Sequence, residues 1–162
     1  MISITKGLEH MAWSNQMIFD ELAKLPEDIY GLRAAEGEWP VGKILNHFLN
    51  AAEWFRYCLT GEKWSNLPKI QKHEILKESQ LKLAKLDLVL INESLKPDAE
   101  ITFQDESGPV NSTRSVVLTQ AIVHTAEHKG QLSTILKANG YQLDLDKFDV
   151  WSFPIEPESS RI

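Results

Sequence analysis

The fold is decided by residues 113–140, which read TRSVVLTQAIVHTAEHKGQLSTILKANG. Apolar residues recur there every three or four positions, and two histidines share their row: Val117, Ala121, His124, His128, Leu132 and Ile135. This spacing is typical of an α-helix with one buried face. Thr113 is a suitable N-cap, and Asn139-Gly140 is a strong left-handed stop signal. The stretch therefore predicts a long helix that carries two histidines on its apolar face.

Three further helices are predicted before this stretch. In residues 3–25 the apolar positions alternate steps of three and four, which is the helical period. A second helix lies between Pro40 and Gly61, and a third covers about residues 70–95. In residues 97–113 apolar and polar side chains alternate around the turn sequence DESGP, which predicts a short β-hairpin or an extended segment.

These elements predict an all-α fold, a four-helix bundle with long crossover connections and a short hairpin or extended segment before the last helix. We expect a single domain over residues 1–162. Its tail, about residues 141–162, is predicted to be irregular, to pack partly and to fray near its end. At this length a hydrophobic core stabilises the fold without disulfides or a structural metal.

The composition narrows the expected partners and compartments. The chain has 23 acidic and 17 basic side chains, a net charge of -6 and no dense basic cluster, which argues against nucleic-acid binding. No apolar run approaches the ~20 residues that cross a bilayer, so we expect no membrane partner. The N-terminus lacks a secretory signal, and Cys58 is the single cysteine. We therefore expect a cytoplasmic location and no internal disulfide.

The histidines are the residues best suited to chemistry. His124 and His128 lie four positions apart, so their imidazoles share one face of a helix and can hold one metal ion. Buried imidazole nitrogens need partners, and one divalent ion would satisfy both rings. His47, on the inner side of the second helix, can supply a third nitrogen and leave an open position, as in catalytic zinc sites. The alternative is that these are core histidines bonded to backbone, hydroxyl groups or water.

Several other polar residues have a structural interpretation beside a functional one. Glu127 is rotated away from the neighbouring histidine, so we interpret it as solvated or close to the ligands rather than as a ligand. Gln131 could orient a histidine or touch a substrate. Gly130 is most simply explained by the close approach of another helix. His10 and His73 are predicted to lie on the surface.

Three segments together resemble a known family. The sequence HTAEHKGQ at residues 124–131 is similar to the His-x3-His-Arg-Gly-Gln signature of the DinB/YfiT-like superfamily of metalloenzymes. The sequence HMAWSN at residues 10–15 is similar to the opening helix of that family. The sequence LNH at residues 45–47 resembles its metal histidine on the second helix. The resemblance spans residues 5 to about 146.

The resemblance implies a four-helix bundle in which His47, His124 and His128 hold a divalent metal, usually zinc or nickel. It also implies frequent homodimers and, among characterised relatives, thiol-dependent transferases and isomerases that use bacillithiol, mycothiol or glutathione. Many relatives have no assigned activity. Lys129 stands where arginine is usual, and lysine lacks the planar bidentate fork of arginine. Contacts made by that arginine in relatives are therefore not carried over to this chain.

Together these arguments predict a divalent-metal-binding protein, a thiol S-transferase that joins a small electrophile to a low-molecular-weight thiol cosubstrate. A metal produces a thiolate near neutral pH and holds it beside the electrophile, so no protein nucleophile is required. The alternatives are a metal-dependent hydrolase of unknown substrate, a non-catalytic metal-binding helical bundle, and an interaction domain whose histidines bind nothing. The expected partners are a small-molecule substrate and a second copy of the chain.

Overall fold

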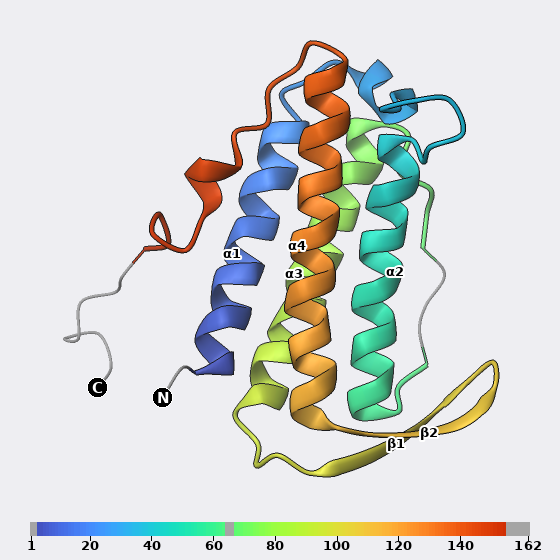
Figure 1. Ribbon diagram of the computed structural model, residues 1–162, viewed down its shortest axis with the longest axis vertical. Helices are drawn as coiled ribbons and strands as arrows, with labels where there is room; N and C mark the ends of the chain where they lie inside the picture. Colours follow the sequence, from blue (N-terminus) through green and yellow to red (C-terminus); the bar gives the residue numbers. More distant parts are fainter. Residues whose placement is uncertain (1–2, 64–66, 155–162) are drawn as a thin grey trace.

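The computed structural model describes residues 3–63 and 67–154, and this part of the chain is mostly helical (Figure 1). Its four long helices are α1 (Ile4–Leu22), α2 (Val41–Thr60), α3 (His73–Ser94) and α4 (Arg114–Ala138). The antiparallel strands β1 (Glu100–Asp105) and β2 (Gly108–Thr113) form a two-stranded sheet, and η1 (Glu27–Gly31) and η2 (Leu145–Phe148) are short 3-10 helices. The four predicted helices are confirmed. The segment before α4 is a hairpin rather than merely extended chain.

The chain path brings α2 beside α4 (Figure 1). Both α1 and α2 pack against α3 and α4. The connection over residues 23–40 crosses one end of the helices, whereas α2 and α3 run in the same direction (Figure 1). As a result, the first half of α2 lies opposite the middle of α4, and these are the segments that carry the three candidate histidines.

The helix ends coincide with the predicted signals. The Thr113 side chain accepts a hydrogen bond from the backbone N–H of Val116 and so caps α4. Gly61 ends α2 with a φ of 74°, a left-handed conformation that glycine adopts without strain. Helix α3 begins three residues later than predicted, because Ile70 enters the core and its N–H donates to Asn46 Oδ1.

Apolar side chains from all four helices form two buried clusters. The larger one lies toward the end where residues 23–40 cross, and its members include Phe19, Leu45, Leu83 and Leu132. The smaller one lies toward the hairpin and includes Leu8, Phe55, Leu90 and Leu118. Full burial of one such side chain contributes about 1.5–3 kcal/mol. In the described ranges, none of the helices has the length and apolar character needed to cross a membrane.

The two histidines predicted to lie on the surface are half-buried and bonded instead. His10 Nε2 lies 2.9 Å from the carbonyl oxygen of Phe148, and its ring contacts Phe153, so the tail packs on α1. His73 Nδ1 lies 2.7 Å from the Tyr30 hydroxyl. Periodicity could not reveal these partners, because both come from irregular segments. The predicted fraying of the last residues lies outside the described part of the chain.

Candidate metal centre

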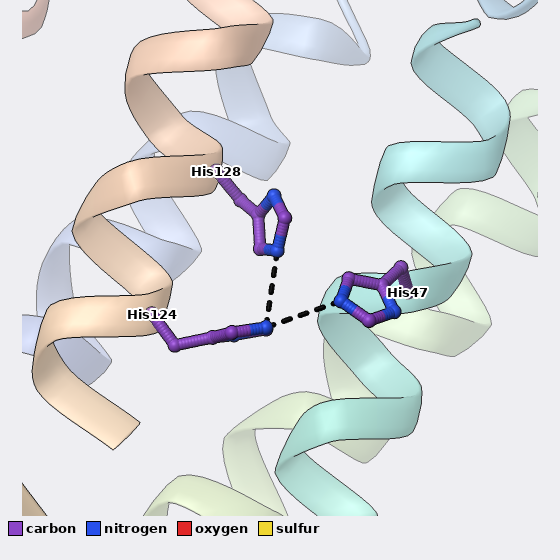
Figure 2. Close-up of side chains that lie close together, drawn as sticks. All are labelled: His47, His124 and His128. Carbon is purple, nitrogen blue, oxygen red and sulfur yellow. Dashed lines mark hydrogen bonds between the residues drawn. The ribbon is translucent and has the colours of Figure 1, made fainter. Parts of the chain in front are cut away.

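Three histidine rings meet between α2 and α4 (Figure 2). His124 Nε2 lies 3.1 Å from His47 Nε2 and 3.1 Å from His128 Nε2. One ring nitrogen from each residue lies within 4.8 Å of the others. The structure thus brings together the three histidines that the sequence predicts as ligands, although their helices are far apart along the chain.

Helix geometry and apolar neighbours aim these rings at one another. His124 and His128 project from successive turns of α4 toward α2 (Figure 2). The Phe55 ring packs edge-on against His124, with ring centres 5.7 Å apart. The Trp39 ring packs edge-on against His47, with ring centres 5.2 Å apart. These aromatic contacts restrict the orientations of the His124 and His47 rings.

Gln131 fixes the orientation of one ring. Its side-chain Oε1 accepts a hydrogen bond of 2.7 Å from His128 Nδ1. In neutral His128 the proton therefore lies on Nδ1, and the Nε2 lone pair faces the other two rings. Metal-ligating histidines are usually held by such a bond from the distal ring nitrogen. Of the two roles considered for Gln131, the structure shows the orienting one.

Burial favours the neutral form of His124 and His47. Desolvation, together with charge repulsion from the neighbouring His128 and His47, lowers the pKa of His124 to about 4. The pKa of His47 is also lowered, first by burial and then by His128 and Lys43. Neutral imidazoles offer lone pairs, which are what a metal ion requires.

The donor set fits a divalent transition metal. The Nε2 atoms approach one another rather than a backbone or hydroxyl group of the described residues. Lone pairs at this separation repel unless a proton or a cation lies between them. Two nitrogens 3.1 Å apart can both lie about 2.1 Å from one ion, the usual zinc–nitrogen distance. Imidazole ligands suit zinc, nickel, copper and iron alike.

A cavity of about 640 Å³ opens beside the rings. His47 and His128 line it, together with Glu38, Trp39 and Glu127. This volume lies within the range of about 300–1,000 Å³ that is typical of small-molecule sites. The cluster therefore faces a space in which a ligand can approach the Nε2 atoms.

Sequence reasoning missed Glu38 and Trp39, because they lie in an irregular connection without periodicity. Their position just before α2 could have indicated that they lie close to His47. His47 is the seventh residue of that helix, which places it only about 9 Å along the axis from the helix start. The interpretation of Gly130 was wrong. A Cβ there would meet nothing within 4 Å, so this glycine leaves the cavity wall open rather than admitting a helix.

A second polar cluster lies on the opposite side of α4. Lys129 Nζ donates to Ser14 Oγ at 2.5 Å and to the carbonyl oxygen of Met11 at 3.4 Å. Asn15 Nδ2 donates to Asp87 Oδ2 at 2.8 Å. Burial raises the pKa of Asp87 to about 7, while the Asn15 hydrogen bond and the Lys129 charge oppose that rise. Burial lowers the pKa of Lys129, and Asp87 opposes that fall.

Comparison with known proteins covers nearly the whole chain. The sequence profile of the DinB family matches residues 1–150, a range that includes all three histidines of the cluster. The curated Protein DinB of Bacillus subtilis (strain 168) is 20% identical over 166 residues, which cover 96% of this chain and 96% of that protein.

Proposed function

The chain belongs to the DinB family, and from this premise we propose that it binds a divalent metal ion, zinc or nickel, through His47, His124 and His128. The observation that carries the proposal is the convergence of three histidine Nε2 atoms on one point beside a cavity. We also assign the helices to a four-helix bundle that forms one domain over residues 1–162. The packing of α1 and α2 against both α3 and α4 supports this assignment.

Each residue around the site has a distinct task in this proposal. The three imidazoles hold the ion, and Gln131 keeps the His128 proton on Nδ1, away from the ion. Trp39 and Phe55 restrict the orientations of two of the rings. A bound divalent ion supplies Lewis-acid chemistry, which lowers the pKa of a coordinated thiol or water. The cavity holds the small molecule that reacts.

We propose a thiol S-transferase that uses an external low-molecular-weight thiol. Cys58 is buried, and burial raises its pKa to about 12, so it cannot supply the thiolate. Among the described residues, no cysteine, serine or lysine lines the cavity, and the Thr134 hydroxyl that does line it donates to the carbonyl oxygen of Gly130. These observations favour a nucleophile from outside the chain, and a small thiol beside a divalent ion meets this need.

Hydrolysis is the second candidate function. The observation that favours it is the Glu127 carboxylate, which lines the same cavity next to His128 in the chain. A carboxylate within reach of a polarised water acts as a general base. In this version the cavity binds an ester or amide and no thiol is consumed.

Thiol consumption distinguishes the two functions. Zinc- or nickel-loaded protein is incubated with bacillithiol, glutathione or cysteine and a panel of small electrophiles, and His124→Ala serves as the control. The proposal expects loss of thiol that needs both the metal and His124. Hydrolysis of the same compounds without any thiol would favour the second function. Absence of both reactions across the panel would leave a non-catalytic metal protein.

The homodimer implied by the family resemblance and the cytoplasmic location expected from the N-terminal sequence and the single cysteine stay predictions. Light scattering after size exclusion measures the first directly, with about twice the 18.4 kDa chain mass expected. Fluorescence microscopy of a tagged chain in its host measures the second. A monomer at micromolar concentration would contradict the dimer.

A further inference from the structure

The cavity beside the histidines contains two carboxylates from separate elements. Glu38 belongs to the connection that precedes α2, and Glu127 belongs to α4. Both side chains are solvent-exposed, and neither carboxylate forms an ion pair or hydrogen bond within the described residues. Arg33 bonds only the backbone oxygen of Glu38. Two negative groups therefore face the same space without a protein partner.

No cationic side chain among the described residues lines this cavity. The nearby Lys43 Nζ lies over the Trp39 ring, 4.2 Å from its centre, and is held there by a cation–π contact. The only charged side chains that line the cavity in the described part of the chain, apart from the histidines, are therefore the carboxylates of Glu38 and Glu127. A bound metal ion would place its positive charge at the histidines, whereas the carboxylates offer a positively charged ligand group a partner elsewhere in the cavity wall.

The rest of the wall is apolar. Trp39, Ile44 and Ile135 line the space between the carboxylates and the rings. A ligand that uses the whole cavity thus has a compact apolar part, a group that meets the histidine cluster and a positively charged group. A carboxylate-rich ligand, by contrast, would be repelled by Glu38 and Glu127.

We infer that the small molecule bound beside the three histidines carries a positively charged amine, which Glu38 and Glu127 recognise. This inference rests on the proposed metal site and narrows its substrate class to amines. If the cosubstrate is a thiol, it is an aminothiol with few carboxylates, so cysteine should bind better than glutathione or bacillithiol. An exposed ion pair contributes a two- to fivefold preference, so the two carboxylates together give a preference of about tenfold.

The test uses three thiols of similar length that differ in charge: cysteamine, 2-mercaptoethanol and 3-mercaptopropionate. Each is titrated into cobalt(II)-loaded protein at low ionic strength, and the thiolate-to-cobalt absorption band reports the Kd. The measured quantity is the Kd of 3-mercaptopropionate divided by that of cysteamine. The two thiols differ in acidity, so this ratio is compared between variants rather than read alone.

We expect the ratio to fall about tenfold in Glu38→Gln/Glu127→Gln relative to the natural chain. At high salt, the ratio measured for the natural chain should also fall toward that of the variant, because salt screens the exposed carboxylates. Glu36→Gln is the matched control, since Glu36 lies in the same connection but does not line the cavity. It should leave the ratio unchanged.

Two outcomes overturn the inference, and they differ from each other. A ratio that is equal in the natural chain and the double variant, with cobalt bound to both, refutes the amine preference but leaves the metal site intact. Failure of cobalt to bind the natural chain at all refutes the metal site and the inference with it.

Discussion

Two polar clusters lie on opposite sides of α4, and adjacent residues belong to each. His128 faces α2 and meets His47 and His124, whereas Lys129 faces α1 and bonds Ser14. Both clusters place polar side chains among buried apolar ones. The two clusters differ in whether their polar groups are complementary or alike. This difference distinguishes a ligand site from a structural contact.

The Lys129 side is made of complementary groups. An amine donates to a hydroxyl, an amide donates to a carboxylate, and Lys129 and Asp87 carry opposite charges. The histidine side is made of three identical rings whose Nε2 atoms face each other. Unlike groups on the Lys129 side pair with one another and stabilise the fold, whereas three imidazole nitrogens that converge on one point can hold a cation from outside.

The largest effect on stability is expected from Lys129→Met. This change removes the Lys129 hydrogen bonds to Ser14 and Met11 and the cation near Asp87, which is 1% exposed, and buried polar groups that lose a partner destabilise the fold by up to about 3 kcal/mol. Urea unfolding of the metal-free protein measures the loss. Lys137→Met, on the exposed part of the same helix, is the control and should change the free energy of unfolding by less than about 0.5 kcal/mol. Equal losses in the two variants would contradict the buried pair.

The next largest effect is the pH dependence that Asp87 gives to the free energy of unfolding. The folded-state pKa is about 7, above the ordinary value of 3.8. The carboxyl therefore contributes most to stability below about pH 4, and this contribution is lost as pH rises through about 7. In metal-free protein, the free energy of unfolding of the natural chain minus that of Asp87→Asn should fall between pH 4 and pH 8 by on the order of 2 kcal/mol.

The control for this profile is Asp28→Asn, because Asp28 is exposed. Its difference from the natural chain should stay nearly flat over the same pH range. A rising or flat difference for Asp87→Asn would show that its carboxyl is not held in the protonated form by burial.

A smaller effect is expected on the histidine side from Gln131→Ala. Loss of the bond to His128 Nδ1 frees the ring to rotate and to change tautomer. Metal affinity should weaken about tenfold, at the lower end of what such supporting bonds contribute. Competition with a coloured chelator measures it. Gln120→Ala, an exposed glutamine earlier in α4, should leave the affinity unchanged. Equal affinities in both variants would remove Gln131 from the site.

The smallest effect is expected from alanine substitutions at two glycines, one on the open cavity wall and one on a packed helix face. Gly130→Ala adds a methyl group where nothing lies within 4 Å, so the better helix propensity of alanine should stabilise the protein by about 0.5–1 kcal/mol. In Gly7→Ala the new Cβ would lie 3.0 Å from Ile122 Cδ1, on the packed face between α1 and α4. Thermal unfolding should show a gain for the first variant and a smaller gain or a loss for the second. The reverse order would contradict an open cavity at Gly130.

The sequence predicted the helices and the histidine cluster well, for a physical reason. Helical periodicity reports which face of a helix is buried, and His124 and His128 stand in the apolar row of α4. Caps and stops at Thr113 and Gly61 fix where helices begin and end. The likeness of His47 to a family histidine then indicated the third member of the cluster.

Helical periodicity could not predict the remaining side-chain contacts. It indicates which face of a helix is buried, but not which residues of other elements pack against that face. Asn15 lies at helical spacing among the apolar residues of α1, yet its partner Asp87 lies on a helix far away in the chain. Glu38 and Trp39 belong to a connection whose path follows from the packing of other elements. Such residues enter the site only when the fold is assembled.

The central claim is that His47, His124 and His128 hold one metal ion, and metal content tests it most directly. Untagged protein is loaded with zinc or nickel, dialysed and measured by mass spectrometry of the metal, alongside His124→Ala and the control His10→Ala. His124 is the ring that contacts both others, whereas His10 bonds Phe148 outside the cluster. We expect about one ion per chain in the natural protein and in His10→Ala, and almost none in His124→Ala. Equal metal in all three proteins, or none in the natural chain, would contradict the account.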